Sequence, residues 1–189
     1  MNLTSKKYLI FDFDRTIDTL IIDWSRSREG WLNLAKELTG DNSLMIMGNP
    51  YVFQAEIIDR VGQPAIEAFQ TFTKNYEQQN YASHEPNMRL VQFIQDNQDR
   101  YQFFLWTSNH GEVIKPILQD LGLDQSFRQI ITRDLVDYPK PRSAGFDLIF
   151  VPGTNKKDYL MIGDSENDQL AAEAAGIDFI NVVDFEELI

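Results

Sequence analysis

Five short, mostly apolar runs, each followed directly by polar or charged residues, constrain the fold of this 189-residue chain more than any other feature. Continuous rather than alternating apolar runs are typical of strands that are covered on both faces. Stretches with helical spacing separate the runs, which predicts right-handed crossovers and a mostly parallel α/β sheet flanked by helices. The runs are Tyr8–Phe11, Tyr101–Trp106, Gln129–Thr132, Tyr159–Ile162 and Phe179–Val183.

Two of the predicted helices carry clear end signals. Val113–Leu121 has apolar residues at helical spacing, and Gly122 follows it as a stop. Glu166–Ala175 is rich in alanine, follows Ser165 as a predicted N-cap and ends before a glycine. Both helices therefore have bounds that the structure can test.

The region 18–86 has a different character, because it contains helical patterns and no strand-like run. Helices are predicted around Trp31 to Leu38, at Val52–Val61 and at Pro64–Tyr76, and a further helix at Asn87–Gln98 returns to the sheet. We therefore expect a small all-helical domain, 18–86, inserted into an α/β core that is formed by 1–17 and 87–189.

The charge and the absence of cysteine exclude several classes of function. Lys and Arg number 17 and Asp and Glu number 29, so the net charge is −12, which disfavours binding to nucleic acid or to an anionic membrane. The chain has no Cys, which excludes disulfides, thiolate catalysis and thiolate metal sites. No segment resembles a signal peptide or approaches the roughly 20 apolar residues of a membrane span. We expect a soluble, cytoplasmic protein.

Polar side chains gather at the ends of three of the predicted strands. In an open α/β sheet, ligands bind outside the carboxyl ends of the strands, and parallel strands bring these ends to one edge. Lys140 lies between two prolines and precedes the last of the three groups. The groups are Asp12, Asp14 and Thr16; Thr107, Ser108 and Asn109; and Asp164, Ser165 and Asp168.

The chemistry of this edge indicates phosphoryl transfer. Asp12 and Asp164 would be like charges close together, a costly arrangement unless a cation lies between them. Oxygen ligands without Cys or a His cluster favour Mg²⁺, which in turn favours phosphate oxygens. Lys140 would supply a point charge to the same phosphate. Thr107, Asn109 or nearby backbone N–H groups would donate hydrogen bonds to it.

A carboxylate at this edge can also attack phosphorus and form an aspartyl-phosphate. Asp12 directly follows its strand and would be presented rigidly. Asp14, two residues further on, can reach the leaving group. As a general acid Asp14 must be protonated, which requires a raised pKa.

With these residues in place, the sequence resembles the phosphatases of the haloacid dehalogenase superfamily. Four motifs in order carry the resemblance: Asp12 to Thr16, Thr107 to Asn109, Lys140-Pro141, and Gly163 to Asp168. The resemblance covers the predicted core, about 8–18 and 87–184, whereas the insertion matches only in position and helical character. It implies a Rossmann-like core with a helical cap inserted after the first strand.

The resemblance also implies a role for each motif residue. Asp12 would be the nucleophile and a Mg²⁺ ligand. Asp14 would be the general acid, then the base that activates water, and would give its backbone carbonyl to the metal. Thr107 would bind the phosphoryl group, and Lys140 would hold nucleophile and phosphate together. Asp164 would ligate the metal, and Asp168 would do so directly or through water. The dehalogenases of the family lack the second aspartate, so Asp14 favours phosphate esters.

Several positions keep more than one interpretation. Most relatives have Gly where Arg15 stands, so Arg15 either accepts an ordinary backbone conformation or helps to recognise an anionic substrate. The hydroxyl of Thr107 or that of Ser108 could face the phosphate, and Asp168 could instead stabilise a helix start. Trp24, Arg26, Arg28 and Trp31 could line a pocket or serve cap packing. The stretch 141–158 lacks a long amphipathic pattern, which predicts a shortened layer there.

We therefore expect an enzyme, a Mg²⁺-dependent phosphoric monoester phosphatase that acts on a small phosphorylated metabolite through an aspartyl-phosphate. Two alternatives stay open: a phosphomutase of the same fold, and a non-catalytic phosphate-binding or regulatory protein. The intact set of acidic residues argues against the second alternative.

Overall fold

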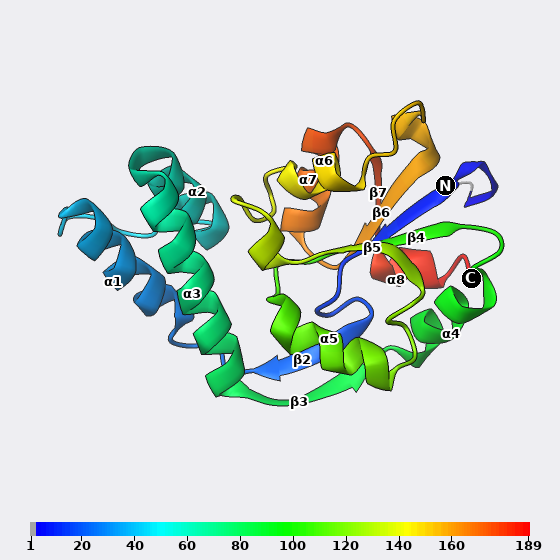
Figure 1. Cartoon of the computed structure of the whole chain (residues 1–189), viewed down its shortest axis with the longest axis horizontal. Coiled ribbons are helices and arrows are strands. Elements are labelled where there is room, and N and C mark those ends of the chain that lie inside the picture. The colour runs from blue at the N-terminus through cyan, green and yellow to red at the C-terminus, as the bar shows by residue number, and fades with distance from the viewer. Residues whose placement is uncertain (1–2) are drawn as a thin grey trace.

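The computed structural model describes residues 3–189; Met1 and Asn2, which open the predicted core segment 1–17, lie outside the described residues. Its five-stranded sheet is parallel throughout, with the strand order β5-β4-β1-β6-β7 (Figure 1). All five predicted strands are present, each shifted by at most two residues at either end. They are β1 (Tyr8–Phe11), β4 (Gln102–Trp106), β5 (Phe127–Ile131), β6 (Tyr159–Gly163) and β7 (Asp178–Asn181).

The central strand β1 is covered on both faces, which explains why its residues are continuously apolar. Leu9 and Phe11 face a hydrophobic cluster with α4 (Met88–Asp96), α5 (Gly111–Asp120) and α8 (Val182–Glu186). Tyr8 and Ile10 face the opposite cluster, with α6 (Ala144–Ile149) and α7 (Glu166–Ala175). The sheet is therefore the middle of three layers.

The ends of the core helices follow the signals in the sequence. Helix α7 begins with a capping box between Ser165 and Asp168 and ends at Gly176, which has φ 72°. Helix α5 begins at Gly111, two residues before the predicted Val113, because the ring nitrogen of His110 accepts the Glu112 N–H at 3.3 Å and caps the helix. Helix α6 has only six residues, as the missing amphipathic pattern predicted.

Three further helices lie beside the core and form the centre of the segment 18–86, which we call the cap (Figure 1). These helices are α1 (Ser27–Thr39), α2 (Pro50–Val61) and α3 (Gln63–Asn80). They share a hydrophobic cluster of their own that includes Trp31, Ile57 and Phe69. The assignment of the cap as a separate domain remains a prediction.

The expectation that 18–86 contains no strand is wrong at both ends of that segment. Strands β2 (Asp18–Ile22) and β3 (Tyr81–Pro86) pair antiparallel and connect the three helices to the core (Figure 1). Strand β3 is polar and largely exposed, so it lacks the apolar run of a strand that is covered on both faces, and β2 has only the short apolar run Leu20–Ile22. The buried Asp18 carboxylate lies 2.7 Å from His84 Nδ1 and joins the two strands.

Short 3₁₀ helices complete the described elements at Leu3–Ser5, Arg133–Leu135 and Lys156–Asp158. Within residues 3–189, no helix combines the length and the apolar character that crossing a bilayer requires.

Candidate active site

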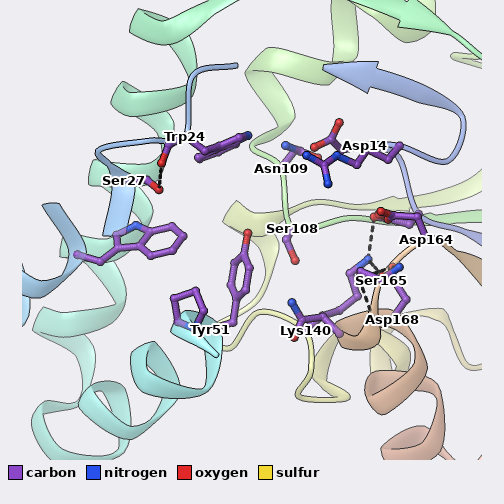
Figure 2. Close-up of a pocket in the computed structure, with 15 residues that line it drawn as sticks. Asp14, Trp24, Ser27, Tyr51, Ser108, Asn109, Lys140, Asp164, Ser165 and Asp168 are labelled. Carbon is purple, nitrogen blue, oxygen red and sulfur yellow. Dashed lines mark hydrogen bonds and ion pairs between the residues drawn. The ribbon is translucent and has the colours of Figure 1, made fainter. Parts of the chain in front are cut away.

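A cavity of about 300 Å³ lies between the carboxyl edge of the sheet and the cap. Figure 2 shows Trp24, Ser27 and Tyr51 of the cap across this cavity from Lys140 and the acidic residues of the core. Of the polar and charged residues predicted at this edge, all but Thr16 and Thr107 line the cavity. The lining residues are Asp12, Asp14, Arg15, Trp24, Ser27, Trp31, Pro50, Tyr51, Ser108, Asn109, Lys140, Asp164, Ser165, Asn167 and Asp168.

The strand order explains why residues so far apart in the sequence meet here. Because β1 lies between β4 and β6, the residues that follow these three strands are neighbours at one edge. Asp12 follows β1, Ser108 and Asn109 follow β4, and Asp164 follows β6. The predicted convergence is therefore confirmed by the topology of the sheet.

A buried ammonium group links two of the carboxylates. Lys140 Nζ donates to Asp12 Oδ1 at 2.7 Å and to the Trp106 carbonyl oxygen at 2.9 Å, and it also forms an ion pair with Asp168. Burial by itself would lower the pKa of Lys140, but the two carboxylates raise it above its ordinary value. Lys140 therefore remains cationic and fixes the position of Asp12.

Two carboxylates of the site, those of Asp12 and Asp164, have pKa values above their ordinary range. Burial raises the pKa of Asp12, and the charge of Asp168 raises it further, to about 7, although Lys140 opposes both effects. Burial also raises the pKa of Asp164, with smaller contributions from Asp168 and Asp14. Burial and mutual repulsion both disfavour the ionised carboxylates, and a bound cation would offset both effects.

The donor set fits Mg²⁺. Asp12, Asp164 and Asp168 can each place one ligand atom within 4.8 Å of the others, and carboxylate oxygens are the ligands that Mg²⁺ prefers. Asp168 is already engaged, because one oxygen faces Lys140 and the other accepts the Ser165 N–H at 3.1 Å and its hydroxyl at 2.7 Å. Of the two metal roles left open for Asp168, a contact through water fits this arrangement better. The helix-start interpretation of Asp168 also holds, since it completes the α7 capping box.

Asp14 has the environment that a general acid requires. Its Oδ1 accepts the Leu20 N–H at 2.9 Å, and burial raises its pKa even though that hydrogen bond and the charge of Arg15 lower it. A raised pKa favours the protonated form that can donate to a leaving group.

Arg15 does not adopt an ordinary backbone conformation, so that interpretation is wrong. Its φ is 58°, in the left-handed region that L residues avoid and glycine accepts without strain. The exposed side chain lines the cavity, and its charge acts on Asp14. The chain therefore keeps a strained arginine beside its candidate general acid.

Thr107 and Ser108 have different surroundings. Thr107 is 2% exposed, and its hydroxyl donates to Asn109 Oδ1 at 2.9 Å and accepts the Asn109 N–H at 3.1 Å. Ser108, rather than Thr107, lines the cavity. The arrangement favours Ser108 as the hydroxyl that faces a phosphate, while a phosphoryl contact of Thr107 remains a prediction.

The cap supplies residues that the sequence did not single out. Pro50 and Tyr51 begin α2, just before the helix predicted at Val52–Val61, and line the cavity. The Trp31 ring packs on the Tyr51 ring, with centroids 5.5 Å apart, so Trp31 serves both pocket and cap packing. Burial raises the pKa of Tyr51 to about 12, which keeps its hydroxyl protonated.

Of the other cap candidates, Trp24 lines the cavity and stacks on Tyr76. Arg26 and Arg28 are absent from the cavity lining, and Arg28 donates instead to the Ile46 carbonyl oxygen at 2.8 Å. The two arginines therefore belong to the outer surface of the cap.

Comparison with known proteins finds relatives among the phosphoglycolate phosphatases. The sequence is 40% identical over 76 residues to phosphoglycolate phosphatase 1 of Pseudomonas aeruginosa, a match that covers 39% of this chain and only 27% of that relative. It is 25% identical over 201 residues to phosphoglycolate phosphatase of Colwellia psychrerythraea, covering 96% of this chain and 86% of that relative.

Solved structures share the fold. A haloacid dehalogenase superfamily hydrolase from Geobacter sulfurreducens superposes with a TM-score of 0.54 at 18% identity, covering 94% of this chain and 87% of that one. A predicted phosphoglycolate phosphatase from Haemophilus somnus superposes with a TM-score of 0.59 at 18% identity, covering 95% and 86%. The sequence profile of the haloacid dehalogenase-like hydrolases matches residues 9–182, nearly the whole chain, and the protein belongs to that family.

Proposed function

We propose that this protein is a Mg²⁺-dependent phosphatase that hydrolyses a small phosphate monoester through an aspartyl-phosphate on Asp12. The observation that carries the proposal is the group of Asp12, Asp164 and Asp168, with ligand atoms within 4.8 Å of one another, beside a buried lysine. Membership in the family and the phosphoglycolate phosphatases among the relatives support it.

In the first proposed step, a carboxylate oxygen of Asp12 attacks phosphorus, and the bond between phosphorus and the leaving-group oxygen breaks. Protonated Asp14 gives its proton to that oxygen, so the leaving group departs with a neutral hydroxyl group and not as an alkoxide. Mg²⁺, held by Asp12, Asp164 and the backbone carbonyl of Asp14, would offset the negative charge of the phosphoryl oxygens.

In the second step, water attacks phosphorus, and the bond between phosphorus and the Asp12 oxygen breaks. Asp14, now a carboxylate, accepts the proton of the water, and inorganic phosphate is released. Lys140 keeps the Asp12 carboxylate in one orientation through its 2.7 Å hydrogen bond, and Asp168 in turn orients Lys140. Asp12 and Asp14 then return to their initial protonation states.

The cap side of the cavity is where the leaving group would lie. Among the lining residues that the structure describes, only Arg15 and Lys140 are cationic, and both come from outside the cap. Lys140 is occupied by Asp12 and Asp168. A second anionic group, such as the carboxylate of the phosphoglycolate named for the relatives, would therefore have to pair with Arg15.

The proposal is tested by following phosphate release from an aryl phosphate and from a panel of phosphorylated metabolites that includes phosphoglycolate, while Mg²⁺ is titrated. We expect turnover that depends on Mg²⁺ and is lost on adding a chelator. Folded protein without Mg²⁺-dependent turnover on any ester would contradict the proposal and favour the binding protein. Phosphate transfer between positions of a sugar, without release, would instead establish the mutase.

The covalent step can be tested separately. Acid quenching during turnover should trap the acyl phosphate, and borohydride reduction should convert it to homoserine at position 12, which peptide mass spectrometry detects. The Asp12→Asn variant is the matched control and should give no such product. Reduction at another carboxylate would reassign the nucleophile.

A further inference from the structure

A fully buried carboxylate of the cap lies against the core loop that carries Ser108. Glu77, near the end of α3, is 0% exposed. One of its oxygens accepts the side-chain amide of Asn109 at 3.1 Å, and the other accepts the backbone N–H of His110 at 2.9 Å. The cap therefore holds the two residues that directly follow Ser108.

The same loop is tied to the core on its other side. The Thr107 hydroxyl donates to Asn109 Oδ1 at 2.9 Å, so the Asn109 amide is bound at its oxygen by the core and at its nitrogen by Glu77. Ser108 lies between these bound residues and faces the cavity. Its position consequently depends on contacts from both parts of the molecule.

A second buried contact of the same kind lies beside the first. Arg133, 1% exposed, donates through Nη2 to Oε1 of Gln54 on α2 at 2.7 Å. The Arg133 N–H also donates to the Asn109 carbonyl oxygen at 2.9 Å, which connects the loops after β4 and β5. Gln54, Glu77, Asn109 and Arg133 thus form one cap–core cluster.

The composition of this cluster is unlike ordinary packing between two parts of a protein. Burying a carboxylate is costly unless donors compensate for the lost water, and apolar contacts would join two surfaces at lower cost. Burial accordingly raises the pKa of Glu77 to about 7, against the hydrogen bonds from His110 and Asn109. Both groups that donate to Glu77 belong to the loop of the candidate active site. The cost of burying this carboxylate is therefore better explained by a role in the site than by stabilisation of the fold.

We propose that Glu77 is a positioning residue for phosphoryl binding: its carboxylate fixes the loop 107–110 when the cap packs on the core, so that the phosphoryl site is complete only with the cap in place. This inference rests on the proposed function, because it assumes that Ser108 and the neighbouring backbone contact a phosphoryl group. A cap that moves away would take Glu77 with it and release the Asn109 amide and the His110 N–H.

Glu77→Gln tests the role with little change in shape. A glutamine side chain offers one acceptor and one amide donor, so it turns an N–H group toward one of the two loop donors. With Mg²⁺ present, we expect the inhibition constant of inorganic phosphate and the KM of an aryl phosphate each to rise about tenfold, the factor that corresponds to ~1.4 kcal/mol.

Asp59→Asn is the matched control, because Asp59 also joins cap to core, accepting from Tyr138 at 2.7 Å and from Arg142 at 3.0 Å, but it is exposed and distant from the loop in sequence. It should change both constants less than twofold. If Glu77 served stability alone, Glu77→Gln would lower the amount of active enzyme and hence Vmax. An unchanged inhibition constant for phosphate would therefore overturn the proposal.

If Glu77→Gln does not fold, hydrogen exchange in the wild-type protein tests whether Glu77 is coupled to phosphoryl binding. Because coupling is reciprocal, saturating inorganic phosphate with Mg²⁺ should slow exchange of the His110 amide, whose partner is Glu77. Unchanged exchange of that amide would overturn the proposal. A protein that hydrolyses no ester yet shows this protection would refute the proposed function while leaving the role of Glu77 supported.

Discussion

Replacing Arg15 by glycine should stabilise the protein, although glycine usually weakens a folded chain. Arg15 has φ 58°, and the left-handed region costs an L residue roughly 1–2 kcal/mol, which glycine avoids. Glycine also gains freedom in the unfolded chain, which removes roughly 0.5–1 kcal/mol of the benefit. The net gain is about 0.5–1 kcal/mol. With an unfolding entropy of roughly 2.1 cal/mol/K for each residue, that gain raises Tm by about 1–3 °C in a chain of 189 residues.

Arg15→Ala separates strain from charge, because alanine removes the guanidinium and keeps the Cβ that makes the conformation costly. Denaturant unfolding of the three proteins should place Arg15→Gly above Arg15→Ala by about 0.5–1 kcal/mol. Equal stability of the two variants would refute the reasoning, since it would mean that the strain at position 15 does not exceed the entropic cost of glycine.

The same pair of variants reports on Asp14. The guanidinium lowers the pKa of Asp14 against the effect of burial, so its removal should raise that pKa further. Because Asp14 acts first as an acid, the alkaline limb of the pH profile of kcat should move to higher pH, by the same amount in both variants. A shift in one variant alone would show that backbone conformation, and not charge, controls Asp14.

Three further outcomes are expected. Asp12→Asn should remove turnover and leave the circular dichroism spectrum unchanged; activity within tenfold of wild type would exclude Asp12 as the nucleophile. Lys140→Ala leaves the buried Asp12 and Asp168 carboxylates without their cation and should cost ~3–5 kcal/mol in denaturant unfolding without Mg²⁺, whereas a loss below ~1 kcal/mol would contradict the buried ion pairs. Asp12 and Glu77 both have folded pKa values of about 7, above their ordinary values of 3.8 and 4.5, so the folded state binds more protons than the unfolded state between about pH 4 and pH 7. Stability without Mg²⁺ should therefore fall as pH rises through that window, by up to ~4 kcal/mol for Asp12 and ~3 kcal/mol for Glu77, and Glu77→Gln should reduce the fall; greater stability at pH 8 than at pH 5 would contradict both shifts.

The sheet and the core side of the site were predictable because their signals are local. A strand covered on both faces must be apolar along its whole length, so Tyr8–Phe11 and Tyr159–Ile162 were visible in the sequence. Asp12 and Asp164 follow these strands directly, and parallel topology alone brings them together. The four motifs therefore placed most of the candidate site without any knowledge of the cap.

The parts that were not predictable depend on contacts between distant segments. Strand β3 is polar and exposed, and only its pairing with β2 makes it a strand. Glu77 lies in a polar stretch at the end of a long helix, where an acidic residue is ordinarily solvated. Glu77 is buried only because α3 packs on the loop after β4, and no local pattern in the sequence indicates that packing.

The charge of the site determines the order in which its partners can bind. With every group ionised, Asp12, Asp14, Asp164 and Asp168 contribute −4 and Arg15 and Lys140 contribute +2, so the lining sums to −4 + 2 = −2. A phosphate dianion would meet net repulsion, which the overall charge of −12 reinforces. One divalent cation brings the sum of the lining to zero. Phosphate should accordingly bind far more weakly without Mg²⁺ than with it, and inhibition by phosphate that is independent of the metal would show that Arg15 and the loop donors suffice on their own.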